Sequence, residues 1–99
     1  MIPQNPNIII SEIIEEKLDK KHGVTRREVE QCFENRDGHL LIDDRPENRT
    51  KPPTRWFIAQ TNKNRYLKIT YVYRDGKYFL KSAYDPNQEE FRIYNKYGY

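Results

Sequence analysis

The sequence is poor in the residues on which several classes of function depend. It has a single cysteine, Cys32, which excludes an intramolecular disulfide and a zinc site built on cysteines. It has no glycine-rich phosphate loop, no nucleophile elbow and no HExxH motif. It also has no apolar run of the length of a signal peptide or a membrane span, so we expect a cytoplasmic protein without a membrane partner.

The length and composition predict one small folded domain, residues 1–99. A chain of this length can bury a single, modest core. Charged residues make up 33% and hydrophobic residues 35%, so much of the chain must lie at the surface. The aromatic share of 13% is nevertheless above that of a disordered chain, so we expect the domain to fold.

Charged and aromatic residues are unevenly distributed between the two halves of the chain. Residues 1–50 hold 8 lysines and arginines against 11 acidic residues, whereas residues 51–99 hold 10 against 4. All eight tyrosines and the single tryptophan also lie beyond residue 50. Cations interleaved with rings suit nucleic acid, because cations bind phosphates and rings stack on bases. The same tyrosine-rich alternation is equally ordinary for a β-sheet.

The first helix is expected to begin at Ser11, an N-cap residue, and to end at Gly23, which readily adopts the left-handed conformation. The apolar run at 8–10 either forms a short strand or leads into this helix. The buried stripe of the helix recurs every four residues, at Ile14, Leu18 and His22. A histidine that ends such a stripe is commonly a structural cap, and it can also serve chemistry.

A second helix is expected to follow at once. Thr25 and Glu28 have the spacing of a capping box, and Val24 and Val29 have that of a hydrophobic staple. The two helices should therefore meet at a tight corner, with His22 near the N–H groups that begin the second helix. Such N–H groups can receive a phosphate.

From residue 39 the apolar pattern changes to a period of two, which predicts strands. We expect four strands and then a short helix, at 39–43, 55–61, 66–74, 77–84 and 87–94. Asp75-Gly76 should form a two-residue hairpin turn. The acidic stretch with Asp43, Asp44 and Glu47 lacks the spacing of a calcium loop, so we expect no metal site.

The hairpin turn predicts which residues share a face of the sheet. Its register pairs Thr70 with Lys81 and brings Lys68 to the same face. A four-residue loop before the hairpin would add Arg55 and Phe57 to that face. Three cations beside an aromatic ring would form a phosphate cradle. The alternative is an ordinary solvated face that resists aggregation.

Three groups of short motifs follow one another along residues 17–94. The helix corner carries Lys21-His22-Gly23-Val24, followed by Glu28 and Phe33. The C-terminal part carries Ser82-Ala83, followed by Glu90, Arg92 and Tyr94. Between them lie two dipeptides, Arg55-Trp56 and Asn64-Arg65. In order and spacing these motifs resemble those of the BrnT toxin family.

The resemblance implies an α+β fold of the RelE-like toxins, with two N-terminal helices packed on an antiparallel sheet of three or four strands and a short C-terminal helix. It also implies a metal-independent endoribonuclease that cleaves messenger RNA without a cofactor and binds an antitoxin protein in a hetero-oligomer. Such cleavage needs a base for the 2′-hydroxyl, cations for the charge on phosphorus and an acid for the leaving oxygen.

Candidate residues for these roles follow from their chemistry and from the resemblance. His22 is the candidate base or acid, because imidazole titrates near neutrality. The candidate catalytic cations that bind phosphate are Arg55, Lys68, Lys81 and Arg92. The candidate substrate-binding residues are Arg26, Arg27, Arg65, Phe57, Tyr84 and Tyr94. His39 has no supporting residues, and we interpret it as structural.

Two other functions stay open at this stage. The same basic, aromatic face could bind nucleic acid or a protein without chemistry, because Tyr84 stands where the BrnT family has an arginine. Similar short proteins also carry the label ADP-ribosyl-dinitrogen-reductase hydrolase, a function that would require a divalent metal. Nothing in the sequence argues for that activity.

Overall fold

The computed structural model of the protein describes residues 7–43 and 51–99, which form an α+β fold with three helices and a five-stranded mixed sheet. A π-helical turn, η1, continues the first helix. The elements are β1 (Ile8–Ile9), α1 (Glu12–Lys17), η1 (Leu18–His22), α2 (Arg26–Asn35), β2 (Leu41–Ile42), β3 (Thr54–Gln60), β4 (Tyr66–Arg74), β5 (Lys77–Tyr84) and α3 (Gln88–Tyr97). Among the described residues, no helix combines the length and the apolar character needed to cross a membrane.

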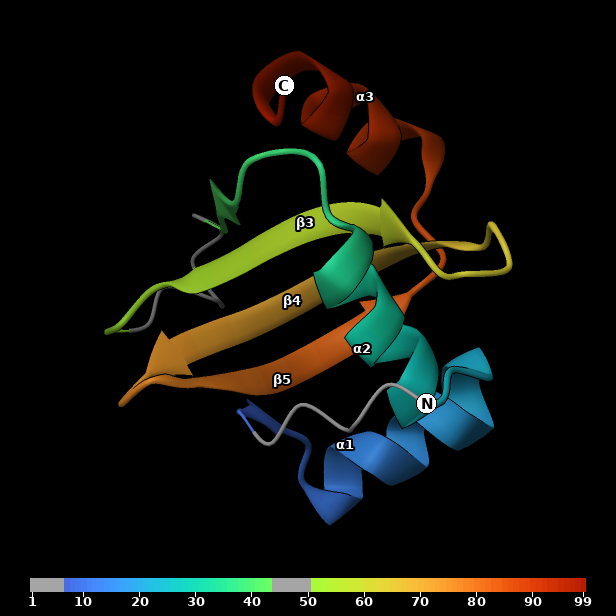
Figure 1. Cartoon of the computed structure of the whole chain (residues 1–99), viewed down its shortest axis with the longest axis vertical. Coiled ribbons are helices and arrows are strands. Elements are labelled where there is room, and N and C mark those ends of the chain that lie inside the picture. The colour runs from blue at the N-terminus through green and yellow to red at the C-terminus, as the bar shows by residue number, and fades with distance from the viewer. Residues whose placement is uncertain (1–6, 44–50) are drawn as a thin grey trace.

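The sheet differs from the predicted antiparallel one by an added strand. Its order is β1-β5-β4-β3-β2, and β1 pairs parallel to β5 through Ile8 with Tyr78 and Ile9 with Phe79. The other pairs are antiparallel. The short apolar run at 8–10 thus forms the strand that the sequence left open, and it covers the free edge of β5 (Figure 1).

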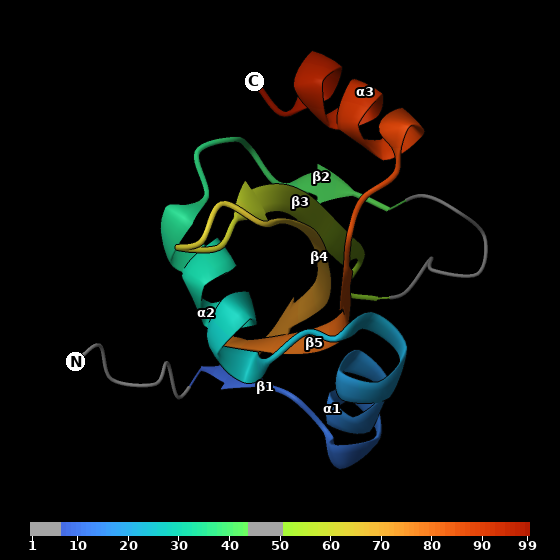
Figure 2. The ribbon, with the colours of Figure 1, turned by 90° about the vertical axis from the view of Figure 1, so that its right-hand side faces the viewer.

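The sheet curls around α2, whereas α1 and α3 lie outside the curl near its two edges (Figure 2). We call the side of the sheet toward α2 the concave face and the other side the convex face. The concave face carries Leu67, Ile69 and Tyr71, as predicted, and the ring of Phe33 on α2 lies 5.4 Å from that of Tyr71. The first N-terminal helix packs against β5 instead, through α1 and η1. Only α2 therefore covers the predicted face.

The connection between β3 and β4 is one residue longer than predicted, and this changes the faces of β3. The backbone N–H of Thr61 donates to the carbonyl of Arg65 at 2.8 Å, which closes a five-residue loop, residues 61–65. Arg55 pairs with Tyr71 and Phe57 with Ile69, so both lie on the concave face. A shift of one residue in register moves every side chain to the opposite face. The predicted position of Arg55 and Phe57 beside Lys68 was therefore wrong.

The hairpin of β4 and β5 is confirmed up to a bulge. Asp75 and Gly76 have φ values of 54° and 75°, which a two-residue hairpin turn of this type requires. The predicted pairs are present from the turn to Tyr71, which pairs with Leu80. The next residue, Thr70, pairs with Ser82 and not with Lys81. Lys81 is the extra residue of this bulge, so its predicted pairing with Thr70 was wrong.

The tight helix corner is also confirmed. Gly23 adopts the left-handed conformation (φ 60°) that ends η1. Thr25 and Glu28 form a reciprocal capping box at the start of α2, and the staple residues Val24 and Val29 are both buried. The corner is therefore held by local hydrogen bonds and by apolar packing.

Loss of this cap should be measurable. We expect Thr25→Ala to lower the free energy of unfolding by about 1 kcal/mol, because the side chain of Thr25 satisfies a backbone N–H that has no partner within the helix. Thr25→Ser retains the hydroxyl and should unfold close to the wild-type urea midpoint. Equal midpoints for Thr25→Ala and the wild type would contradict the proposed contribution of the cap.

Candidate functional site

The cations and rings that the sequence prediction grouped into one cradle lie on two faces of the sheet. Arg55 and Phe57 are on the concave face, whereas Lys68 is on the convex face. Lys81 also lies on the convex face, with its Nζ 3.4 Å from Thr54 Oγ1. Phe57 is fully buried, so it cannot stack on a base. The phosphate cradle inferred from the sequence is therefore not formed.

The two candidates on α3 are separated as well. Arg92 is exposed and donates from Nε to Glu89 at 3.0 Å, which lowers the pKa of that carboxyl group. Tyr94 is buried, and its hydroxyl donates to the carbonyl of His39 at 2.9 Å. Burial raises the pKa of Tyr94. Tyr94 thus packs α3 onto the sheet, and its hydroxyl is occupied by the carbonyl of His39.

The two arginines at the start of α2 differ in their surroundings. Arg26 donates from Nη2 to the carbonyl of Ile8 at 2.7 Å and lies 3.3 Å from Glu30, so it connects α2 to β1. Arg27, the next residue of the helix, is exposed. Lys21, two residues before the corner glycine, is exposed too. The basic surface of the corner therefore consists of Lys21 and Arg27 rather than of the arginine pair.

Arg65 connects the helix corner to two other segments, and we call it with its four acceptor residues the Arg65 clamp. Its Nη1 and Nη2 donate to the carbonyl oxygens of Gly23 (2.9 Å) and His22 (3.0 Å). The guanidinium also binds the carboxylates of Asp85, at 3.1 and 2.9 Å, and of Glu28, at 3.2 Å. These five bonds use all five donors of an arginine. Arg65 therefore holds the corner together and has no N–H left for a phosphate.

Four ionisable side chains meet at the end of the convex face, and we call them the Tyr84 cluster: His22, Lys68, Tyr84 and Glu90. Lys68 Nζ lies 2.8 Å from Glu90 Oε2, and the hydroxyl of Tyr84 donates to the same oxygen at 2.7 Å. The rings of Tyr84 and His22 are 5.6 Å apart, centroid to centroid. The cluster thus unites η1, β4, β5 and α3.

The charge of Lys68 is compensated within this cluster. The residue is only 5% exposed, and its Nζ lies 4.6 Å from the ring centroid of Trp56, a favourable cation–π distance. Together with Glu90, these two residues line a cleft of about 600 Å³ between α3 and the edge formed by β2 and β3. Because Asp43 and Glu89 line the same cleft, it is a poor receptor for a phosphate.

Glu90 is the centre of the cluster. Burial disfavours its charge, but the hydrogen bonds from Lys68, from the backbone N–H of Asn87 and from Tyr84 outweigh burial and keep the pKa of Glu90 below its ordinary value. Glu90 is therefore an anion at neutral pH, and it orients the phenol of Tyr84. His22 is half-buried at the end of η1, where its ring contacts that of Tyr84. The backbone carbonyl of His22 belongs to the Arg65 clamp.

Sequence reasoning missed the acidic partners of the candidate cations. It treated Glu28 as a cap alone and left Glu90 either to orient a nearby arginine or to be an ordinary surface charge, although Glu28 binds Arg65 and Glu90 binds Lys68. One local signal was available, because Asn87 and Glu90 have the spacing of a capping box and do form one. The partnership of Arg65 with Asp85 had no such signal.

Among residues 7–43 and 51–99, no three side chains of His, Cys, Asp or Glu lie close enough together to hold a metal ion. Asp44 and Glu47 of the acidic stretch lie outside the described residues. No protein-family model, no curated protein and no solved structure matches this chain.

Proposed function

We propose that the protein is a metal-independent endoribonuclease toxin of the RelE-like class and that it cleaves messenger RNA at the Tyr84 cluster. The observation that carries this proposal is the contact of a half-buried imidazole, His22, with a phenol that a partly buried carboxylate orients. A carboxylate whose pKa is shifted by a specific charge partner and that lines a cleft, as Glu90 does, marks a candidate functional site. The proposal keeps His22 from the sequence prediction and replaces the cation cradle with Tyr84 and its partners.

The chemistry would proceed by internal attack of the RNA. His22 takes the proton of a 2′-hydroxyl, the 2′-oxygen bonds to phosphorus, and the bond from phosphorus to the 5′-oxygen breaks. Tyr84 donates its proton to the leaving 5′-oxygen, and the imidazolium of His22 then returns a proton to the phenolate. The products are a 2′,3′-cyclic phosphate and a 5′-hydroxyl. The exposed Lys21 and Arg27 would bind the flanking phosphates.

We expect purified protein to cleave a mixed-sequence RNA in excess EDTA, and His22→Ala to be slower by about 10²–10⁴-fold, the usual contribution of a proton-transferring residue. Tyr84→Phe should also be slower, because it removes the phenolic proton. His39→Ala is the matched control, since it replaces the other histidine, whose side chain is exposed. RNA that stays intact, both free and on translating ribosomes, would contradict the proposal.

The implied partners follow from the same proposal. The substrate is RNA in the cytoplasm, and a cognate antitoxin would keep the enzyme inactive in a hetero-oligomer. Acidic side chains of such an antitoxin would suit the basic corner of Lys21 and Arg27, because opposite charges steer association.

A second candidate function is a binding module without chemistry. It is favoured by the ion pair of Lys68 with Glu90. The sequence prediction assigned the charge of Lys68 to phosphate binding, and Glu90 neutralises that charge. This function predicts RNA binding that weakens steeply with salt while the RNA stays intact. The EDTA experiment, repeated as a binding titration at two salt concentrations, distinguishes the two functions.

A further inference from the structure

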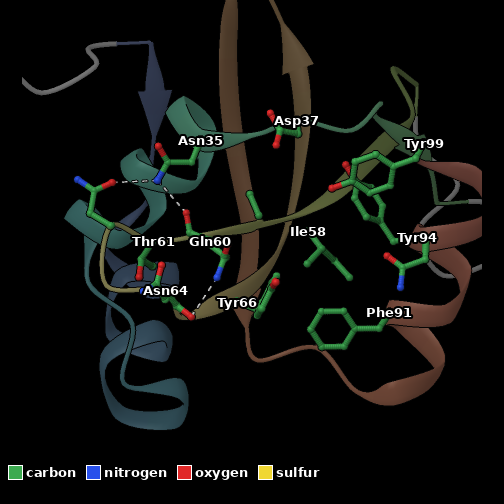
Figure 3. A pocket seen from close by; sticks show the side chains of 13 residues that line it. Asn35, Asp37, Ile58, Gln60, Thr61, Asn64, Tyr66, Phe91, Tyr94 and Tyr99 are labelled. Carbon is green, nitrogen blue, oxygen red and sulfur yellow. Dashed lines mark hydrogen bonds between the residues drawn. The ribbon is translucent and has the colours of Figure 1, made fainter.

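A second concave site lies on the other side of loop 61–65 from the helix corner. It is a pocket of about 510 Å³ between the end of α2, the end of β3 and α3 (Figure 3). Five amide side chains and four aromatic side chains line it, and none of its described lining residues is a lysine or an arginine. We call it the amide pocket. Its lining suits an uncharged group with a flat face, because no cation is present to hold a phosphate.

The aromatic side chains of the amide pocket form two pairs that flank Ile58 (Figure 3). The ring of Tyr66 meets that of Phe91 edge to face at 5.2 Å, and the rings of Tyr94 and Tyr99 meet at 5.6 Å. Tyr66 is 47% exposed beside Phe91. An exposed ring at the wall of a pocket is a stacking surface for another flat ring.

The amide side chains form the polar edge of the pocket. Asn35 Nδ2 donates to the carbonyl of Gln60 and to Asn62 Oδ1, each at 2.9 Å, which holds loop 61–65 against α2 (Figure 3). Within the described part of the chain, Asn35 Oδ1 and Gln60 Oε1 accept no hydrogen bond, and the amide of Asn95 makes none. Oriented acceptors and a free amide can therefore meet a ligand that carries both donors and acceptors.

We propose that the amide pocket binds an unstacked nucleobase of single-stranded RNA, stacked on Tyr66 and hydrogen-bonded at its edge by the amides. Adenine fits best, because asparagine and glutamine amides pair with its N6 and N7 atoms. This inference rests on the proposed function, since it assigns the pocket to a base of the substrate. The pocket and the helix corner both adjoin loop 61–65, because Thr61, Asn62 and Asn64 line the pocket and Arg65 binds the corner, so the proposal places one RNA strand across this loop.

The test measures binding of free adenosine to the full-length protein by NMR titration, apart from any cleavage. We expect chemical-shift changes that saturate at millimolar adenosine. Tyr66→Ala should weaken binding roughly 10-fold, the loss of one base-aromatic stack, and Asn95→Ala should weaken it with no effect on folding, since this side chain is exposed. Tyr73→Ala is the matched control, because Tyr73 is an exposed tyrosine of β4 outside the pocket.

The outcomes separate the two proposals. Adenosine binding that depends on Tyr66, with RNA left uncleaved, would support the pocket and refute the nuclease. RNA cleavage with no adenosine binding, or with equal effects of Tyr66→Ala and Tyr73→Ala, would refute the pocket and leave the nuclease intact. Binding of an oligosaccharide such as maltotriose at Tyr66 and Asn95, in place of adenosine, would also overturn the nucleobase assignment, because sugars too bind amides and rings.

Discussion

Glu90→Ala is expected to lower the free energy of unfolding by about 3–5 kcal/mol, because it leaves the ammonium of Lys68 buried without its carboxylate. Lys68 is only 5% exposed, so water cannot replace the missing partner. The variant also loses the capping box with Asn87 and the acceptor of Tyr84. A small domain has about 5–15 kcal/mol of stability in total, so this change approaches global unfolding.

The buried charge can be tested apart from the other losses. Glu90→Gln retains a side-chain oxygen for the capping box but removes the negative charge. Lys68→Met/Glu90→Gln then removes the positive charge as well and should be more stable than Glu90→Gln alone, because no unpaired charge stays buried. Urea unfolding of the wild type and the three variants would measure this coupling. A double variant no more stable than Glu90→Gln would refute the explanation.

The same ion pair should give stability a dependence on acid pH. The folded-state pKa of Glu90 is lower than its ordinary value, so folding favours the charged carboxylate. Its contribution is therefore fully present above the unfolded pKa of about 4.3 and is lost as the pH falls through the folded-state pKa. Stability measured from pH 7 down to 3 should fall less in Glu90→Gln than in the wild type.

Features that depend on neighbouring residues could be predicted from the sequence. Gly23, the capping box of Thr25 and the Asp75-Gly76 turn each depend on side chains a few residues apart, and all three occur as predicted. The strands β4 and β5 also have the predicted bounds. Local signals succeed here because their hydrogen bonds form between residues that are already close in the chain.

Register could not be predicted beyond the residues next to the Asp75-Gly76 turn. Asn64 adopts a left-handed conformation (φ 66°) that helps close loop 61–65, and nothing in the sequence distinguishes this loop from one with a residue fewer. That single residue decides whether Arg55 lies on the concave or the convex face. The bulge at Lys81 is a similar case, because it shifts the pairing of β4 with β5 by one residue beyond Tyr71.

The candidate site failed in part for a related reason. Lys68 was predicted to bind RNA from the hairpin register and Arg65 from the resemblance, yet both bind carboxylates 20 or more residues away in the sequence. Composition reports which charges are present and does not report their partners. The contact of His22 with Tyr84 was not predicted either, because the two residues are distant in sequence; local signals predicted only the helix corner that places His22.

Arg65→Lys is expected to lower the free energy of unfolding by about 2–3 kcal/mol, although it keeps the positive charge. An ammonium cannot reach the carbonyl oxygens of His22 and Gly23 and the carboxylate of Asp85 together, because it is a point charge without the planar fork of a guanidinium. Arg92→Lys is the matched control. Arg92 and its partner Glu89 are more than 60% exposed, so its urea midpoint should not change.

The Arg65 clamp should also make the stability of the protein depend on acid pH. The hydrogen bond from Arg65 lowers the pKa of Asp85, so the contribution of this pair to stability is present above the unfolded pKa of about 3.9 and is lost as the pH falls through the folded-state pKa.

At neutral pH the Arg65→Lys variant should exchange the backbone N–H hydrogens of Gly23 and Val24 with solvent faster than the wild type, because Arg65 no longer binds the carbonyl oxygens at this helix end. Unchanged exchange at these two residues, together with a lowered urea midpoint, would mean that Arg65 stabilises the fold without positioning His22. Faster exchange at the corner would instead make Arg65 the residue through which loop 61–65 holds the imidazole beside Tyr84.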